Sequence, residues 1–223
     1  MDQVITPGEY LSFLDARLPG LVAGAHLYGS RVLDDVVPDS DLDIVIELSS
    51  PAEVPAVEGA DVAVVPAGSL EKPVFDVTPL SGEITPVLWQ QLRTVGQTVR
   101  GTRPSCPGTA ADVEAYCRDN LATYWKTEFD HFRGIAPSLD PEASIGRANL
   151  LWVGLGPARL WHTIRTGEIV SKSRAGVLAA ARWPDLPILE LVASRRGEDV
   201  PLKVSHALAS LDLYDRIVAD VTT

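Results

Sequence analysis

Cysteine, basic residues and long hydrophobic runs are all scarce in this sequence. Only two of its 223 residues are cysteines, Cys106 and Cys117, and they make no metal-ligand spacing with a partner pair. No run approaches the roughly 20 apolar residues of a membrane-spanning helix. Residues 1–4 lack the basic and apolar regions of a secretory signal peptide. We therefore expect a cytoplasmic chain with reduced thiols and no membrane partner.

Acidic residues outnumber basic ones by 30 to 19, which gives a formal net charge of −11. Since a nucleic-acid-binding protein of this size usually presents a basic face, we expect no nucleic-acid partner. The acidic balance suits a cationic small molecule, although solubility alone also explains it. With 46% hydrophobic residues the chain can bury a core, and its length fits one large domain or two small ones.

The first half of the chain has the pattern of a domain that mixes strands and helices. A first helix is predicted to begin near Pro7, because apolar side chains recur at helical spacing from Tyr10 to Leu18. Short apolar runs then predict four strands, followed by one helix and one extended piece. The predicted strands cover residues 22–28, 42–48, 61–65 and 74–80, the helix residues 85–95, and the extended piece residues 98–100.

Residues 101–108 contain two glycines and two prolines, which break regular structure, and we interpret them as a linker. The remaining pattern is helical, and Gly167 is expected to end one of the helices as a C-cap. The predicted helices cover residues 111–132, 143–166, 173–182, 186–196 and 202–221. The expected fold class is therefore α+β, with an α/β-type domain and a small mixed sheet at residues 1–105 and an all-α helical bundle at residues 106–223.

Two carboxylates lie in and beside the predicted strand at residues 42–48. Asp41 and Asp43 are two positions apart, so on a strand they project from one face while Leu42 and Ile44 point into a core. Like charges side by side are unfavourable, and a divalent cation relieves the repulsion. Sites with few protein oxygens, completed by phosphate and water, are typical of Mg²⁺. The pattern therefore predicts Asp41 and Asp43 as metal ligands.

Gly29 and Ser30 follow the first predicted strand. Glycine permits a tight turn and a close approach of the backbone to a ligand. If a helix starts at this point, its free amides can bind phosphate, and the Ser30 hydroxyl adds a donor. The other aspartates of this segment, Asp34, Asp35 and Asp39, are interpreted as loop and turn residues.

Residues 28–46, YGSRVLDDVVPDSDLDIVI, resemble the signature of the polymerase-β-like nucleotidyltransferase superfamily, with Gly-Ser, a spacer and then Asp-x-Asp on a strand. The resemblance implies transfer of a nucleotidyl group from a nucleoside triphosphate, with two Mg²⁺ ions held by carboxylates. The attack on the α-phosphorus would be in line, and the metals would clamp the attacking and leaving oxygens while pyrophosphate leaves.

Enzymes of this superfamily use a third acidic residue on a neighbouring strand. Asp76 is the first candidate, because it sits inside the apolar run at residues 74–80. Asp61 opens the preceding predicted strand and is the second candidate, although an edge or turn position also explains it. The third carboxylate would accept the proton of an attacking hydroxyl or complete the metal site.

A second resemblance comes from the helical half of the chain. Residues 158–172, ARLWHTIRTGEIVSK, resemble a segment of the aminoglycoside 3''-adenylyltransferase family, which modifies streptomycin and spectinomycin. The N-terminal stretches SDLDIVI and FDVTPL fit the same family in the same order. The resemblance implies ATP as the co-substrate and an all-helical second domain.

The same resemblance implies roles for individual residues. The ATP contacts would fall on Ser30, Ser40, Arg159 and Lys172. The metal carboxylates would fall on Asp41 and Asp43, and the catalytic base, normally a glutamate, on Asp76. Arg159 also lies in an otherwise apolar stretch, where a guanidinium needs an anionic partner, either a triphosphate or a core carboxylate.

The acceptor side departs from the family pattern. In the family, acidic residues on the long helix before the arginine hold the cationic groups of the antibiotic, but residues 145–152 contain no acid. The segment after Asp76 also looks short for an aromatic platform. Other acids of the helical half could form a different acidic wall or be plain surface charge: Glu114, Glu128, Asp130 and Glu142.

Three functions are compatible with these patterns. The first is Mg²⁺-dependent transfer of AMP from ATP to a hydroxyl of a small molecule, such as a cationic aminoglycoside or aminocyclitol antibiotic. The second is adenylyl transfer to a protein partner, as in small antitoxin-like enzymes. The third is a nucleotide-binding module without turnover. The sequence leaves the oligomeric state open.

Overall fold

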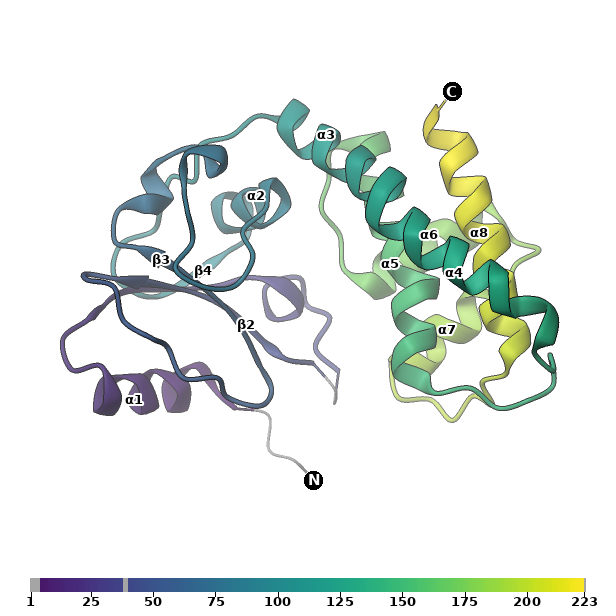
Figure 1. The fold of residues 1–223 in the computed structure, drawn as a ribbon, viewed down its shortest axis with the longest axis horizontal. Helices are drawn as coiled ribbons and strands as arrows, with labels where there is room; N and C mark the ends of the chain where they lie inside the picture. Colours follow the sequence, from purple (N-terminus) through teal and green to yellow (C-terminus); the bar gives the residue numbers. More distant parts are fainter. Residues whose placement is uncertain (1–4, 38–39, 223) are drawn as a thin grey trace. The chain divides into compact units, whose positions relative to one another are not determined.

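The structure is a computed structural model that describes residues 5–37 and 40–222. The chain divides into two compact units, Met1–Asp112 and Val113–Thr223 (Figure 1). This division falls after the predicted boundary at residues 105 and 106, because Cys106 packs in the core of the first unit and its N–H donates to the Leu70 carbonyl at 2.9 Å. The predicted turn residue Asp39 lies outside the described residues.

The N-terminal unit is a four-stranded mixed sheet in the order β3-β2-β1-β4. β1 is antiparallel to β2 and β4, whereas β2 is parallel to β3. The small mixed sheet is therefore confirmed. The elements are α1 (Pro7–Arg17), β1 (Val22–Leu27), η1 (Gly29–Arg31), β2 (Leu42–Leu48), β3 (Ala60–Pro66), η2 (Ser69–Glu71), η3 (Val74–Asp76), α2 (Pro86–Thr94) and β4 (Gln97–Arg100).

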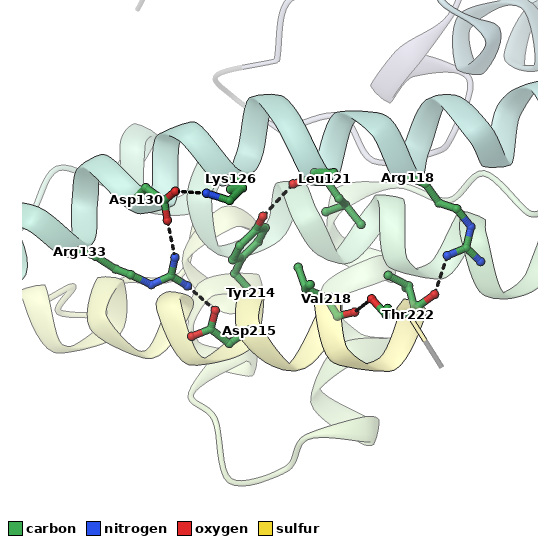
Figure 2. Close-up of a pocket in the computed structure, with 11 residues that line it drawn as sticks. Arg118, Leu121, Lys126, Asp130, Arg133, Tyr214, Asp215, Val218 and Thr222 are labelled. Atoms are coloured by element: carbon green, nitrogen blue, oxygen red, sulfur yellow. Dashed lines mark hydrogen bonds and ion pairs between the residues drawn. The ribbon is translucent and has the colours of Figure 1, made fainter.

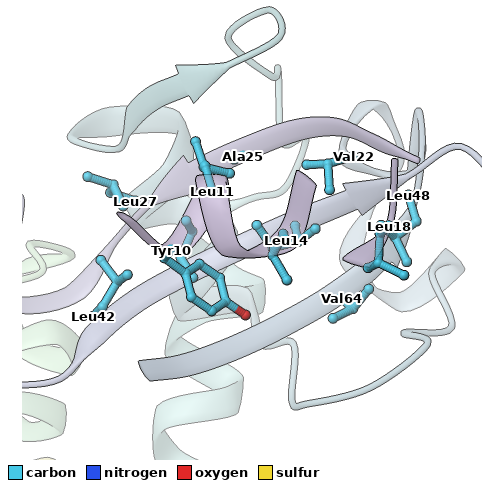
Figure 3. Close-up of a cluster of buried hydrophobic side chains, with 12 residues drawn as sticks. Tyr10, Leu11, Leu14, Leu18, Val22, Ala25, Leu27, Leu42, Leu48 and Val64 are labelled. Carbon is cyan, nitrogen blue, oxygen red and sulfur yellow. The ribbon is translucent and has the colours of Figure 1, made fainter. Parts of the chain in front are cut away.

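α1 begins at a capping box and covers one face of the sheet. The Thr6 hydroxyl accepts a hydrogen bond from the Glu9 N–H at 3.2 Å, and the Glu9 carboxylate accepts one from the Thr6 N–H at 2.9 Å. The apolar side of the helix, with Tyr10 and Leu14, packs on alternate side chains of the strands, such as Leu42 (Figure 3). This alternation follows from the two-residue period of a strand.

α2 covers the opposite face. Its residues Leu88, Trp89 and Leu92 pack in a second core with Val45 of β2 and Cys106. The Trp89 indole N–H donates to the Lys72 carbonyl at 3.0 Å, which ties the helix to the loop after β3. Because Asp43 and Val45 are two positions apart, Asp43 projects toward this α2 face of the sheet.

A buried polar pair lies on the same face. His26, on β1, is 1% exposed, and one of its ring nitrogens lies 3.1 Å from Oε1 of Glu47 on β2. The other Glu47 oxygen accepts from the Gly68 N–H at 2.8 Å. Burial raises the pKa of Glu47, but the hydrogen bonds from His26 and Gly68 outweigh burial and leave the pKa lowered.

The fourth predicted strand, at residues 74–80, is wrong. The chain there forms the single 3₁₀ turn η3, closed by backbone hydrogen bonds from Asp76 N–H to Pro73 O and from Val77 N–H to Val74 O. Proline cannot donate to a strand ladder; Pro73 directly precedes this segment and Pro79 lies within it. Only an isolated bridge between Ser81 and Val64 reaches β3.

The C-terminal unit is all helical, as predicted. The predicted helix at residues 111–132 forms as two α-helices joined by a five-residue π-helix. Gly167 ends α5 with φ at +75°, which confirms the predicted C-cap. The elements are α3 (Ala110–Asn120), η4 (Leu121–Trp125), α4 (Lys126–Ile135), η5 (Ala136–Ser138), α5 (Arg147–Thr166), α6 (Lys172–Arg182), α7 (Ile188–Arg195) and α8 (Val204–Thr222).

Packing of α8 against the π-helix region relies on Tyr214. Its ring stacks on Phe129 at 4.4 Å between centroids, and its hydroxyl donates to the Leu121 carbonyl at 2.7 Å. In the part of the chain that the structure describes, no helix combines the length and the apolar character needed to cross a membrane.

Candidate active site

The chain turns sharply at Gly29, directly after β1. Gly29 has φ at +68°, in the left-handed region, and η1 closes a single 3₁₀ turn. A Cβ atom on Gly29 would lie 1.9 Å from Oδ2 of Asp43, so the Asp43 carboxylate fills the space that any side chain would need. Glycine is therefore required here both for the backbone conformation and for the close approach of Asp43.

Asp43 meets this turn from β2. The Asp43 carbonyl accepts a hydrogen bond from the Tyr28 N–H at 3.1 Å, and its Oδ2 accepts one from the Ser30 N–H at 3.2 Å. Leu42 and Ile44 on either side are fully buried in the α1-side core, while Asp43 is half-buried. The structure thus brings together three predicted site residues, Gly29, Ser30 and Asp43.

The backbone amides of the turn differ from the expected phosphate site. η1 is only three residues long and no α-helix starts at Gly29. The Gly29 N–H donates to Oε1 of Gln91 at 2.8 Å, and the Ser30 N–H donates to Asp43. The expectation of free amides at a helix start is therefore wrong, because side chains of the same unit occupy both amides.

The Ser30 hydroxyl remains available. Its oxygen is buried and has no hydrogen-bond partner among residues 5–37 and 40–222. A buried hydroxyl without a partner costs free energy, and buried polar groups in native proteins are nearly always paired. A phosphate oxygen at this position would satisfy it.

β3 places Asp61 beside Asp43. The two strands are parallel, and Asp43 and Asp61 are partners in the register of the pair. The phenol of Tyr28 lies close enough to Asp61 and Asp43 to be affected by their charges. Burial, followed by the charges of Asp61 and Asp43, raises the pKa of Tyr28 well above its usual range, so the phenol stays protonated and can donate.

Asp76 lies in a different setting. It is the last residue of η3, and its side chain is exposed. The argument for Asp76 was that an acid inside an apolar strand needs a reason to be there, and that strand does not form. Of the two acids considered for the third carboxylate, the structure places Asp61, and not Asp76, on the strand next to Asp43.

The two remaining predicted residues of the first unit precede β2. Asp41 is exposed and directly precedes the strand. Ser40 is half-buried, and its hydroxyl accepts a hydrogen bond from the Val37 N–H at 2.9 Å. Both residues therefore lie near the end of the sheet that contains Asp43.

These residues fit a metal ion that takes few of its ligands from the protein. Among the described residues, no group of three or more His, Cys, Asp or Glu side chains is arranged to hold a metal. Mg²⁺ commonly takes one or two carboxylates and completes its shell with phosphate and water oxygens. Asp43, whose carboxylate accepts the Ser30 N–H, and the exposed Asp41 two positions before it are two carboxylates of the kind that such an ion takes from a protein.

Gln91 is a site residue that the sequence interpretation missed. It lies on α2, is 3% exposed, and sits between the core residues Leu88 and Leu92. The available signal was a polar amide within the apolar face of the predicted helix at residues 85–95. Such a residue is costly to bury unless it has a specific partner.

The other two predicted ATP contacts belong to the C-terminal unit. Arg159 lies on α5 and is half-buried, and its charge acts on the buried thiol of Cys117. Burial raises the pKa of Cys117 to about 12 despite the opposing effect of Arg159. Lys172 is the first residue of α6, after the N-cap Ser171, and is also half-buried.

A pocket of about 470 Å³ lies between α3, α4 and α8 of the C-terminal unit (Figure 2). Its floor is apolar, with Leu121, Tyr214 and Val218, and charged side chains surround it. None of the residues predicted as catalytic, metal-binding or ATP-binding lines this pocket. The pocket therefore adds nothing to the predicted active site.

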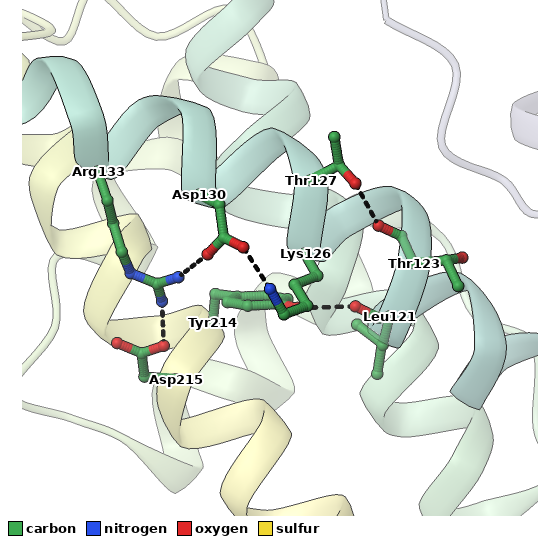
Figure 4. A network of polar contacts seen from close by, with 8 residues as sticks. All are labelled: Leu121, Thr123, Lys126, Thr127, Asp130, Arg133, Tyr214 and Asp215. Carbon is green, nitrogen blue, oxygen red and sulfur yellow. Dashed lines mark hydrogen bonds and ion pairs between the residues drawn. The ribbon is translucent and has the colours of Figure 1, made fainter.

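Most of the acids considered as an acceptor wall are ion-paired. Asp130 bonds both Lys126 and Arg133, and Arg133 also bonds Asp215, in a network along the surface (Figure 4). Glu114 pairs with Arg118 at 2.8 Å and Glu142 with Lys203 at 2.6 Å. These contacts favour the interpretation of plain helix-surface charge for three of the four acids.

Comparison with known proteins finds a family domain in the first unit. Residues 9–78 match the family model described as a nucleotidyltransferase domain, and this range contains β1, β2 and β3 with Gly29, Ser30, Asp43 and Asp61. None of the curated protein sequences matches this chain.

A solved structure matches over the full length. It is the crystal structure of spectinomycin adenyltransferase AAD(9) from Enterococcus faecialis with ATP and spectinomycin. The TM-score is 0.63 at 15% sequence identity, and the match covers 98% of this chain and 100% of that chain. The similarity confirms the predicted fold, a nucleotidyltransferase domain followed by a helical region. The chain thus carries a nucleotidyltransferase domain and is an enzyme of the class that transfers nucleotidyl groups.

Proposed function

We propose that this protein transfers AMP from ATP to a hydroxyl group of a small molecule in an Mg²⁺-dependent reaction. The observation that carries the proposal is the meeting of the Gly29-Ser30 turn with Asp43, next to Asp61 in the register of the parallel strands. This arrangement combines an unsatisfied buried hydroxyl with carboxylates from two neighbouring strands, which suits a triphosphate with its metal ion.

In the proposed reaction, an acceptor oxygen forms a bond to the α-phosphorus of ATP. The bond from the α-phosphorus to the bridging oxygen of the β-phosphate breaks, and pyrophosphate leaves with the electron pair. A carboxylate accepts the proton of the acceptor hydroxyl, and Asp61 is the better placed of the two acids considered. Bound Mg²⁺ would neutralise charge on the triphosphate and on the leaving group.

Individual residues have the following proposed roles. Asp41 and Asp43 hold the metal, and the Ser30 hydroxyl donates to a phosphate oxygen. Ser40, Arg159 and Lys172 remain proposed ATP contacts on the ground of the resemblance, and the guanidinium and ammonium groups are of the kind that bind phosphate. The role of Asp76 as base or metal ligand is supported only by the family resemblance, because Asp76 lies on a turn and not on a strand.

The proposed acceptor class is an aminocyclitol or aminoglycoside antibiotic. The solved relative was crystallised with spectinomycin, and the similarity extends over the helical region as well as the catalytic domain. That coverage favours a small-molecule acceptor over a protein acceptor, because the antitoxin-like alternative was expected for shorter chains. The acid-free residues 145–152 argue that the contacts to the acceptor differ from those of the streptomycin-modifying family.

The buried free thiols of Cys106 and Cys117 suit a reducing compartment, so we propose the cytoplasm as the location. We also propose that nucleic acid is not a partner, since the net charge is −11.

The test is an acceptor screen. The protein is incubated with labelled ATP, Mg²⁺ and a panel that contains spectinomycin, streptomycin and several 2-deoxystreptamine aminoglycosides. We expect a labelled AMP adduct of at least one acceptor together with stoichiometric pyrophosphate, and loss of both products in EDTA. Labelling of a protein from a lysate, with no adduct of any antibiotic, would replace the small-molecule proposal by the protein-acceptor alternative.

A further inference from the structure

The Gly29-Ser30 turn is held from outside by one side chain of α2. Oε1 of Gln91 accepts the Gly29 N–H at 2.8 Å, across 62 positions in the sequence. This bond holds the peptide plane between Tyr28 and Gly29, one residue before Ser30. The Asp43 carboxylate lies against the α-carbon of Gly29 and accepts the Ser30 N–H, so the position of Gly29 is coupled to the positions of Ser30 and Asp43.

α2 is a rigid support for this contact. Its N-cap Thr85 accepts the Leu88 N–H at 3.1 Å, Pro86 begins the helix, and Trp89 bonds the Lys72 carbonyl. Gln91 itself is 3% exposed on the side of the helix that packs in the core. A buried amide there costs free energy unless it has a partner, so the Gly29 bond accounts for a glutamine where an aliphatic residue would otherwise suit the core.

We propose that Gln91 is a positioning residue for AMP transfer, because it holds Gly29 and so sets the places of the Ser30 hydroxyl and the Asp43 carboxylate. This inference rests on the proposed function above. The inference also makes the Ser30 hydroxyl the phosphate-binding donor of this turn, because the Gly29 N–H already donates to Gln91. Gln91 acts through these two residues and contacts no reacting atom.

The test compares Gln91→Met with Gln90→Met. Methionine keeps the length and apolar stem of glutamine but removes the acceptor oxygen. The second variant makes the same chemical change at the preceding position of the helix. We expect Gln91→Met to lower kcat/KM for ATP by about 10- to 100-fold, since small misplacements of catalytic groups have effects of that size. The loss should appear in kcat as well as in KM, and Gln90→Met should stay within about twofold of wild type.

Amide hydrogen exchange separates positioning from a general loss of stability. In Gln91→Met, the Gly29 amide should exchange at least tenfold faster, while the amides inside β2 keep their wild-type protection. Gln91→Glu keeps an oxygen acceptor at the same reach and should recover part of the Gly29 protection and of the kcat. Faster exchange over the whole unit in Gln91→Met, with no local excess at Gly29, would reduce Gln91 to a core residue and overturn the proposal.

The two proposals fail in different ways. If wild type forms AMP adducts and Gln91→Met matches Gln90→Met in kcat/KM and in Gly29 exchange, the positioning role is overturned and the proposed function stands. If wild type forms no adduct with any acceptor, the proposed function fails. The positioning role then survives only if Gln91→Met weakens ATP binding, measured by calorimetry with Mg²⁺, at least tenfold relative to Gln90→Met.

Discussion

At the scale of single residues, Gly29 and Asp43 share one small space. Replacement of Gly29 by alanine would set a Cβ atom 1.9 Å from Oδ2 of Asp43, in a backbone conformation with φ at +68°. We expect Gly29→Ala to lose AMP transfer and to lower the free energy of unfolding of the N-terminal unit by more than the roughly 1–2 kcal/mol that a left-handed alanine costs. Urea titration and the acceptor screen measure the two effects.

Gly20 provides the matched control. It has φ at +75°, but nothing lies within 4 Å of the position of its Cβ. Gly20→Ala should therefore lower the free energy of unfolding only by the roughly 1–2 kcal/mol that a left-handed alanine costs, and it should keep wild-type activity. Equal stability losses in the two variants would mean that Asp43 gives way freely, and that the carboxylate is not held against the turn.

The choice between Asp61 and Asp76 is a second question at this scale. Both acids are exposed, but Asp61 lies in register with Asp43 on the neighbouring strand, whereas Asp76 lies on the turn η3. If Asp61 is the base, Asp61→Asn should lower kcat by about 10²–10⁴-fold, while Asp76→Asn stays near wild type. Single-turnover rates of AMP transfer measure this. The opposite order of effects would return the role to Asp76 despite its place on a turn.

Two buried phenols give opposite expectations for stability. Tyr10 is fully buried and its hydroxyl has no partner among the described residues, and burial raises its pKa to about 12. Tyr214 is also buried, but its hydroxyl donates to the Leu121 carbonyl. Tyr10→Phe should leave stability unchanged or raise it by about 1 kcal/mol, whereas Tyr214→Phe should lower it by about 1 kcal/mol. Urea midpoints decide, and a stability loss in Tyr10→Phe would show that the hydroxyl does have a partner.

Single residues also show how far the sequence alone could predict the site. The Gly-Ser pair and Asp43 were predictable because their spacing and setting are local properties of the chain. Gln91 was missed because its polar amide within an apolar helix face indicates a buried partner but cannot identify one that lies 62 positions away. Asp61 was ranked second because a position at the start of a strand is explained equally well by an edge or a turn, and only the strand register shows that it pairs with Asp43.

At the scale of elements, the spacing of apolar residues along the sequence predicted most of the fold. β1, β2, β3 and α2 appear within one or two residues of their predicted bounds, because each buries apolar side chains at a regular period. Residues 74–80 failed for a physical reason. Their apolar run resembles a strand, but Pro79 within the run and the 3₁₀ turn that begins after Pro73 remove donors that a ladder needs. The hydrophobic period also could not predict the π-helix at Leu121–Trp125, because a π-helix depends on how the helix packs.

Two helix glycines test the packing of these elements. A Cβ atom at Gly156 on α5 would lie 2.4 Å from Cζ2 of Trp125, whereas nothing lies within 4 Å of the Cβ position of Gly134 on α4. Gly156→Ala should lower stability by about 1–3 kcal/mol through overpacking. Gly134→Ala should raise it by about 0.5–1 kcal/mol through helix propensity. Both are read from urea titrations, and a stabilised Gly156→Ala would show that α5 can shift away from the π-helix.

At the scale of the whole molecule, paired carboxylates in both units control the response to acid. Hydrogen bonds lower the pKa of Asp15 through Arg100, of Asp185 through Arg216 and of Asp220 first through Trp161. A carboxyl whose pKa is lower in the folded state stabilises the fold above its unfolded pKa, and this stabilisation is lost as the pH falls through the folded value. We expect the urea midpoint to hold from pH 7 to about 5 and to fall below pH about 4.

Arg216→Gln is the control for this expectation. It removes the arginine that bonds Asp185 and Asp212, so the variant should lose less stability than wild type between pH 5 and pH 3. A wild-type midpoint that rises on acidification would contradict the assignment, because it would require carboxyl groups with raised folded pKa values.

The parallel pairing of β2 and β3 has a consequence for how this protein can vary. Residues 49–59 join the two strands without a helix, and Ala52, Val54 and Val57 of this loop pack on the α1-side core. Extra residues in the loop would lengthen a surface connection and leave the ladder intact. One extra residue inside β3 after Asp61, with the rest of the strand held in register, would instead turn Asp61 to the opposite face of the sheet. We therefore expect an insertion in the loop to keep Asp43 and Asp61 side by side and an insertion a few positions later to separate them, which guides the choice of junctions in chimeras of this enzyme.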